Sequence, residues 1–294
     1  MATASVSSPV SIKNILFVTD LAEASRAALP YAIALAQRYH SQVVLVHALG
    51  AVPFSPIPYE AVPPLDTRPR QMVLPQLEEL RKECIVNGIP TKLALKDGEL
   101  LEVMDMELRE EKPDLIVLGT HSHGALHRLL MGSHAELVVR GARCGVLLVG
   151  RKTVAAARWR DRIARILLAT NYEEGSQHAI EYIAPLAVEH DSEVTLLHVV
   201  DEPVGVPLDA AEIEMNRSTQ GLLEFAARTR LPHAPHLELR VGHPYQEIVD
   251  YSNRNDMDLI VLGRRKGGFF ADHKPSTTVI SVAAEARCPV LTLG

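Results

Sequence analysis

The stretch LIVLGTHSHGALHRLLMGS, residues 115–133, predicts a buried strand, a glycine-opened loop and the first residue of a helix. Four successive apolar residues from Leu115 to Leu118 are typical of a strand covered on both faces, and Gly119 permits a sharp turn after it. A helix that begins at Ser133 would present unpaired backbone N–H groups and its positive dipole end to the loop. Such a helix start can bind an anion.

The same residues have an explanation that needs no ligand. Ser133 and Glu136 have the S-x-x-E spacing of a capping box, in which side chains satisfy the first N–H groups of a helix. Short motifs also match by chance. This stretch alone therefore leaves helix capping and phosphate binding equally open.

An internal repeat supports phosphate binding. ILFVTDLAEAS begins at Ile15 and ILLATNYEEGS begins at Ile166, an offset of 166 − 15 = 151, whereas LIVLG ends at Gly119 and again at Gly263, an offset of 144. We expect the net loss of seven residues (151 − 144) in a loop of the second copy. Each copy alternates short apolar runs with helical periodicity, which predicts a parallel sheet with helices on both faces.

We therefore predict two tandem α/β domains, residues 11–150 and 166–294, each of ordinary domain size. The basic segment 151–165 joins them, matches neither copy and contains Trp159, the only tryptophan. We expect this linker to pack as a short helix across the domain interface, with Trp159 as an anchor.

The composition excludes several classes of protein. The net charge is −6 and the chain has no large basic block, so duplex nucleic acid is not an expected partner. We expect no membrane span, because no apolar run approaches the roughly 20 residues that one requires. The N-terminus lacks a secretory pattern and the chain has 3 cysteines, so a cytoplasmic location is expected. Cys144 and Cys288, at equivalent positions, are expected to be buried.

No standard catalytic motif occurs in the sequence. G-x-x-x-x-G-K-[ST], G-x-G-x-x-G after a strand and G-x-S-x-G are all missing, so no catalytic residue is assigned. His121, His123 and His127, with His134 beyond them, offer zinc as an alternative. However, the nearby Glu136 is better explained as a cap partner, and we predict no metal site.

Asp20 ends the first expected strand and precedes a helix, as Asn171 does in the second copy. Both residue types are good helix N-caps, so capping is expected in both copies. Only the first copy carries the negative charge. The carboxylate of Asp20 is therefore the candidate ligand of a ribose or base.

These residues resemble the universal stress protein family. Its ATP-binding members carry G-x-x-G, nine residues and then G-[ST] after the fourth strand, with an aspartate ending the first. Here Gly119 opens the motif, Ser122 replaces its second glycine, and Gly132-Ser133 close it after nine residues. The resemblance covers nearly the whole chain as two Rossmann-like copies, of the adenine nucleotide alpha hydrolase-like type. It implies a five-stranded parallel sheet of order 3-2-1-4-5 in each copy.

The resemblance also implies ATP, with or without Mg²⁺, in the crevice between strands one and four, the switch point of an open α/β sheet. Asp20 would meet the ribose or base, Val18 and Ala48 would line the adenine pocket, and Leu118 and Gly119 would contact the nucleotide. The phosphates would be held by Ser122, Gly132, Ser133 and the backbone of His134. A serine in place of a glycine at φ > 0 costs about 1 kcal/mol, so Ser122 is expected to weaken binding.

The second copy departs further from the family pattern. Lys266 replaces the second glycine, Ser276-Thr277 replace glycine-serine, and Asn171 replaces the aspartate. We predict that this domain binds no ATP in the family manner and has a structural or regulatory role. Its Arg264, Arg265 and Lys266 are either solvated loop charges or a site for another anion.

Residues 51–70 are rich in proline, and we expect an extended segment that either covers the nucleotide or is a passive loop. The tandem copies resemble the family dimer made within one chain, with final strands meeting at a sheet edge. A further homodimer is compatible with this pairing. The predicted function is a stress-response sensor or regulatory module that binds an adenine nucleotide. The alternatives are a slow ATPase and an interaction module for another ligand or zinc.

Overall fold

The computed structural model describes residues 10–50, 68–120, 133–153, 159, 162–201, 208–264 and 277–294. Its first half contains strands β1 (Asn14–Val18), β2 (Gln42–Leu49), β3 (Thr91–Asp97), β4 (Leu115–Gly119) and β5 (Gly145–Val149), with helices α1 (Glu23–Tyr39), α2 (Arg68–Val86), α3 (Leu100–Glu110) and α4 (Ser133–Gly141). The second half contains strands β6 (Arg165–Ala169), β7 (Glu193–Val200), β8 (His236–Val241), β9 (Leu259–Gly263) and β10 (Val290–Leu293), with helices α6 (Glu174–His190), α7 (Leu208–Ala227), α8 (Pro244–Arg254) and α9 (Thr277–Glu285).

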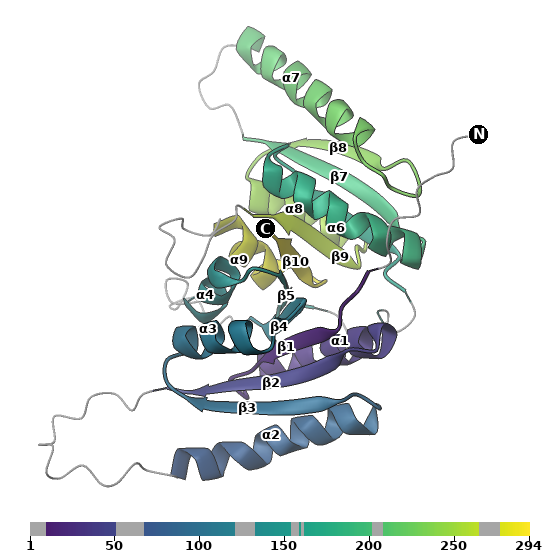
Figure 1. The fold of residues 1–294 in the computed structure, drawn as a ribbon. Helices are drawn as coiled ribbons and strands as arrows, with labels where there is room; N and C mark the ends of the chain where they lie inside the picture. Colours follow the sequence, from purple (N-terminus) through teal and green to yellow (C-terminus); the bar gives the residue numbers. More distant parts are fainter. Residues whose placement is uncertain are drawn as a thin grey trace, which may run out of the picture.

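The strands form one ten-stranded sheet in the order β3-β2-β1-β4-β5-β10-β9-β6-β7-β8 (Figure 1). Within each half the pairs are parallel and the order is the expected 3-2-1-4-5. The two five-stranded sheets join through their final strands, because β5 and β10 pair antiparallel, with Leu147 opposite Leu291. Each last strand thus covers the free edge of the other half. An exposed strand edge has unpaired backbone N–H and C=O groups, and these groups favour such pairing.

The apolar strands are buried because helices cover both faces of the sheet. Along β1, Ile15 and Phe17 point into the core beneath α1, α2, α6 and α7, while Leu16 and Val18 point into the core beneath α3, α4, α8 and α9. This alternation follows from the two-residue period of a strand. It explains why continuous apolar runs, rather than alternating ones, predicted the strands correctly.

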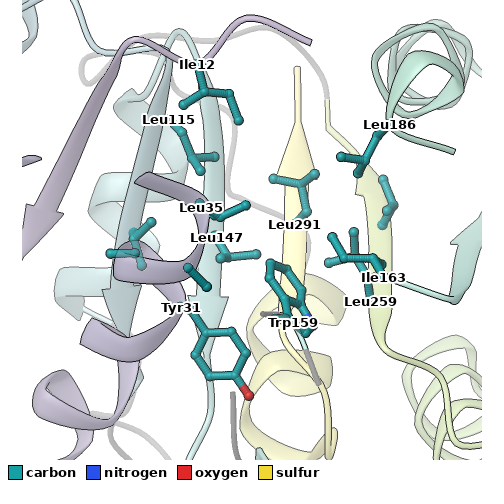
Figure 2. Packing of buried hydrophobic residues seen from close by; sticks show 14 of the residues in the cluster. Ile12, Tyr31, Leu35, Leu115, Leu147, Trp159, Ile163, Leu186, Leu259 and Leu291 are labelled. Atoms are coloured by element: carbon teal, nitrogen blue, oxygen red, sulfur yellow. The ribbon is translucent and has the colours of Figure 1, made fainter. Parts of the chain in front are cut away.

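Trp159 anchors the interface between the halves, as expected from the sequence. Its side chain is 6% exposed, and its indole Nε1 donates to the carbonyl oxygen of Asp258 at 3.0 Å. Its ring meets Tyr31 of α1 edge-to-face at 5.2 Å between centroids (Figure 2). The tryptophan therefore contacts both halves. The residues on either side of Trp159 in the linker, 154–158 and 160–161, lie outside the described residues, so the expected linker helix stays a prediction.

A repeated aspartate fixes the start of each central strand, a role that no local sequence pattern predicts. Asp114 Oδ2 accepts from the backbone N–H groups of Lys13 at 2.7 Å and Asn14 at 3.0 Å. Its counterpart Asp258 accepts, through Oδ2, from the backbone N–H groups of Ala164 and Arg165 at the start of β6, at 2.9 Å each. A carboxylate with two backbone donors holds the loop and the strand together.

Two smaller expectations need correction. Cys288 is buried, but Cys144 is only partly buried, because it lies in the connection between α4 and β5 beside the exposed Arg143. The expected extended segment 51–70 ends early, since residues 68–70 form the first turn of α2. Proline is tolerated in a first helical turn, so Pro69 does not prevent this start. Residues 51–67 lie outside the described residues.

Among the described helices, none is both long and apolar enough to cross a bilayer.

Candidate functional site

The carboxyl ends of β1, β2 and β4 bring three of the predicted residues together. Val18 lies beside Leu118 in the pairing of β1 with β4, and the two side chains are 8% and 5% exposed. Both belong to the core beneath α3 and α4, and Ala48 of β2 packs against that core. The three apolar side chains therefore share one face of the sheet at its switch point, where strand order reverses about β1.

Gly119 is the last residue of β4 and is partly buried. After it, the Thr120 N–H donates to the carbonyl oxygen of Val149 at 2.9 Å, which extends the pairing with β5 by one residue. The Thr120 hydroxyl is buried and has no hydrogen-bond partner among the described residues. Thr120 thus still pairs with β5 where the chain leaves the end of β4.

Asp20 is exposed at the end of β1, and its expected role as the N-cap of α1 is wrong. The N-cap is Ala22, whose N–H donates to Asp20 Oδ1 at 3.0 Å, and the Ser25 hydroxyl donates to the same oxygen. Leu21 between them has φ 65°, so the chain turns once more before the helix begins. The carboxylate therefore holds the turn in front of α1 rather than the helix start itself.

The second half builds the same turn with a neutral side chain. Asn171 Oδ1 accepts from the N–H of Glu173 at 3.2 Å and from the Ser176 hydroxyl at 3.1 Å, and Tyr172 has φ 65°. The N-cap of α6 is Glu173, so the capping expected of Asn171 is wrong for the same reason. At the residue that accepts these bonds, the first half has a carboxylate and the second half an amide, and Tyr172 and Glu173 replace Leu21 and Ala22.

Two equivalent histidines support these turns from β2 and β7. Nδ1 of His47 lies 2.8 Å from the carbonyl oxygen of Thr19, and Nδ1 of His198 lies 2.8 Å from that of Thr170. In the second half the Tyr172 ring also stacks on His198 at 4.3 Å. The two histidines stand at equivalent positions of the repeat, 151 residues apart, and their contacts with the ends of the central strands give this equivalence a structural reason.

The described part of the phosphate region is the backbone of α4, which begins at Ser133 as the sequence predicts. Ser122 and Gly132 lie outside the described residues, as do the side chains of Ser133 and His134. The three histidines of the zinc alternative, His121, His123 and His127, lie outside them too.

Arg264 occupies the position in the second half that Thr120 occupies in the first, 144 residues earlier. The expectation of a solvated charge is wrong for Arg264, because its side chain is partly buried and bound to backbone, whereas the anion site stays a prediction. Its Nη2 donates to the carbonyl oxygens of Ala142 at 2.6 Å and Cys144 at 3.0 Å, in the other half. Burial lowers the pKa of this guanidinium. Arg265 and Lys266 lie outside the described residues.

Comparison with known proteins agrees with this arrangement. The model of the universal stress protein family matches residues 11–150 and again 162–293. A universal stress protein of Thermus aquaticus is 33% identical over 139 residues, covering 47% of this chain and 98% of the relative. Another, from Methanocaldococcus jannaschii, is 28% identical over 141 residues, covering 47% of this chain and 81% of the relative.

The fold has a counterpart among solved structures. The crystal structure of a universal stress protein from Archaeoglobus fulgidus superposes with a TM-score of 0.70, at 18% identity, over 96% of both chains. At that identity the likeness concerns the fold. The two matches of the family model account for most of the sequence. The chain therefore belongs to the universal stress protein family and contains two copies of its domain in tandem.

Proposed function

We propose that the first domain binds ATP at the ends of β1 and β4, and that the protein acts as a stress-response sensor or regulatory module. The observation that carries this proposal is the convergence of Val18, Ala48 and Leu118 on one face of the sheet, with the exposed Asp20 two residues beyond Val18. An apolar surface next to a hydrogen-bond acceptor suits an adenine ring and its ribose.

The proposed contacts follow from the chemistry of each group. Val18, Ala48 and Leu118 pack against the base, and Asp20 accepts hydrogen bonds from the ribose or base. Gly119 lets the backbone come close to the nucleotide. The phosphates, with or without Mg²⁺, bind at the start of α4, through Ser122, Gly132, Ser133 and the backbone of His134. The orientation of α4, whose first residue is Ser133, supports this assignment, since a helix start favours anions.

The second domain, in this proposal, binds no ATP in the family manner. Asn171 supplies no charge at its position, and the Arg264 side chain binds the first domain. We assign this domain a structural or regulatory role. We also place the domain boundaries at 11–150 and 166–294 with a linker at 151–165, and propose a cytoplasmic protein that can form homodimers. Light scattering at several concentrations tests the last point.

The experiment that tests ATP binding is calorimetric titration of the purified chain. Wild-type protein should release heat with one site per chain. The variant Asp20→Asn should bind about tenfold more weakly, because an uncharged amide oxygen replaces the charged acceptor and accepts a weaker hydrogen bond. Its fold should survive, since Asn171 builds the same turn in the second domain. The matched control Asn171→Asp changes the other turn and should leave the affinity unchanged. A wild-type protein that shows no binding at millimolar ATP would overturn the proposal.

A further inference from the structure

Arg264 crosses from the second domain to the carboxyl end of α4 in the first. Its Nη2 donates to two backbone carbonyl oxygens, those of Ala142 and Cys144, at 2.6 and 3.0 Å. Ala142 directly follows α4, and its own N–H still bonds to the carbonyl oxygen of Val138 at 2.9 Å. The arginine therefore binds where a helix leaves carbonyl oxygens without intrahelical partners.

The surroundings hold the side chain in this position. The backbone N–H of Arg264 donates to the carbonyl oxygen of Leu293 at 2.6 Å, which fixes its main chain at the end of β10. A Cβ added to Gly294 would lie 2.7 Å from Arg264 Cγ, so the guanidinium stem passes over a residue that must lack a side chain. Among the described residues its polar partners are backbone carbonyls, and that of Ala142 lies at the negative end of the α4 dipole.

The contact works in one direction only. The equivalent position in the first domain holds Thr120, whose side chain is too short and uncharged to make the reciprocal contact with the second domain. The second domain, whose loop departs from the family pattern, thus supplies a cation to α4 of the first domain, whose loop is closer to that pattern. The shared fold of the two domains does not require this contact, because the first domain does not make it. We therefore look for a functional role of Arg264.

α4 is short, with nine residues from Ser133 to Gly141. At about 1.5 Å per residue, its two ends are separated by only roughly 13 Å. Its first residue is where the proposed function places the phosphates. Because so short a helix is marginal without tertiary contacts, an anchor at one end fixes the backbone N–H groups at the other.

We propose that Arg264 is a positioning residue through which the second domain holds α4 of the first domain ready to bind phosphate. The inference rests on the proposed function, because it concerns the same site. It gives the second domain a specific role, which is to bind the carboxyl end of α4 in addition to the packing of Ala135, Val138 and Val139 in the core.

The test uses the full chain with three substitutions. Arg264→Met removes the donors and the charge while keeping an apolar stem of similar length. Arg264→Lys keeps a charged nitrogen with three donors, and a single nitrogen serves both carbonyls in the wild type. The matched control is Arg165→Met, because Arg165 Nη1 likewise donates to a carbonyl oxygen at a helix end, that of Asn255 after α8, at 2.9 Å, but makes this contact without the first domain.

Two quantities are measured for each protein: the dissociation constant for ATP by calorimetry and the hydrogen exchange of the α4 amides without nucleotide. Arg264→Met should weaken ATP binding about fivefold and speed exchange at the start of α4. Arg264→Lys should recover most of the affinity. Arg165→Met should leave the affinity and the α4 exchange unchanged even where it lowers the unfolding midpoint.

The failure of each proposal gives a different result. If the wild-type chain binds ATP and Arg264→Met binds it equally well, the anchoring role is wrong while the nucleotide site stands. If the wild-type chain binds no ATP, the proposed function fails and the role of Arg264 at that site fails with it. If Arg165→Met weakens binding as much as Arg264→Met, general loss of stability explains the effect and the inference is rejected.

Discussion

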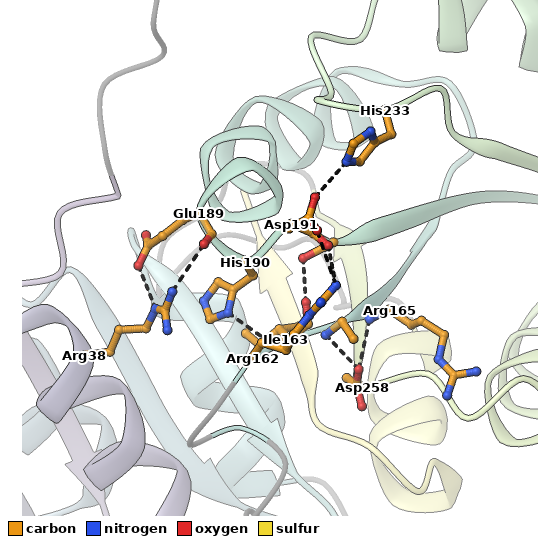
Figure 3. Close-up of polar contacts among 11 residues, drawn as sticks. Arg38, Arg162, Ile163, Arg165, Glu189, His190, Asp191, His233 and Asp258 are labelled. Atoms are coloured by element: carbon orange, nitrogen blue, oxygen red, sulfur yellow. Dashed lines mark hydrogen bonds and ion pairs between the residues drawn. The ribbon is translucent and has the colours of Figure 1, made fainter.

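Arg38 and Glu189 occupy equivalent positions in the two repeats, 151 residues apart, and bind each other: Arg38 Nε lies 2.7 Å from Glu189 Oε1 (Figure 3). Equivalent residues of two copies meet only near the axis that relates the copies. The carboxyl ends of α1 and α6 therefore lie at the internal pseudo-twofold axis. In a symmetric pair of identical domains this position would bring two like charges together, so the two halves have diverged to fit each other.

Reversing one charge of this pair should destabilise the protein, and reversing both should restore it. The side chains are 28% and 30% exposed, so Arg38→Glu or Glu189→Arg alone should lower the free energy of unfolding by about 1 kcal/mol. The double variant should recover most of that loss. Urea denaturation of the four proteins gives the coupling energy. Additive effects of the single changes would show that the pair contributes nothing.

His190 should make folding sensitive to mild acid. It is 3% exposed, and its Nδ1 accepts from the Ile163 N–H at 3.0 Å, so the bound ring is neutral (Figure 3). Burial foremost, and then Arg38, lowers its pKa from 6.5 to about 4; Arg162 acts the same way and Glu189 opposes them. The unfolded chain therefore binds this proton more tightly than the folded protein.

The contribution of neutral His190 to the free energy of unfolding should be fully present above pH 6.5 and be lost as the pH falls toward 4. The loss should be about 1 to 3 kcal/mol, given partial screening. His190→Asn keeps an acceptor near Nδ1 but does not titrate. Urea unfolding between pH 7 and pH 4.5 should show a smaller loss for this variant. Equal pH dependence of the two proteins would contradict the assignment.

Trp159 should contribute strongly to stability. Trp159→Ala removes a buried ring at the interface and should cost about 3 kcal/mol or more. Trp159→Phe keeps an aromatic contact with Tyr31 but loses the donor to Asp258, and should cost about 1 kcal/mol. Circular dichroism must follow unfolding, because the variants lack the only tryptophan. A phenylalanine variant as unstable as the alanine one would show that the hydrogen bond dominates.

Gly150 should tolerate no side chain. It follows β5, and an added Cβ would lie 2.1 Å from the carbonyl oxygen of Ala283 in α9, a backbone atom that cannot move alone. Gly150→Ala should therefore lower the free energy of unfolding by about 2 kcal/mol or more. Gly50→Ala is the matched control, since a Cβ there meets no atom of the described residues within 4 Å. Similar unfolding midpoints for the two variants would contradict this packing.

The sequence predicted what depends on local pattern. Apolar runs such as Leu115–Leu118 identified the strands, and the repeat identified two copies of one domain. Contacts between distant segments leave no such pattern. The antiparallel pairing of β5 with β10 has no local signal, because each strand reads the same whether its edge is free or paired. Only the family resemblance indicated that the final strands would meet.

The candidate site shows the same division. The placement of Val18, Ala48 and Leu118 follows from strand ends that the sequence identifies. The capping roles were misassigned because Leu21 and Tyr172 adopt φ of 65°, which shifts each helix start by two residues and which neither residue type predicts. Arg264 was misjudged because its partners lie 122 and 120 residues earlier, in the other domain.

The antiparallel join between β5 and β10 also has a consequence for how the molecule behaves in solution. Two separate chains that meet through their last strands come apart when they are diluted, whereas here both strands belong to one chain, which keeps them at a high effective concentration. The joined form should therefore persist however scarce the protein is. A cell could lower its copy number without changing the state of any single molecule.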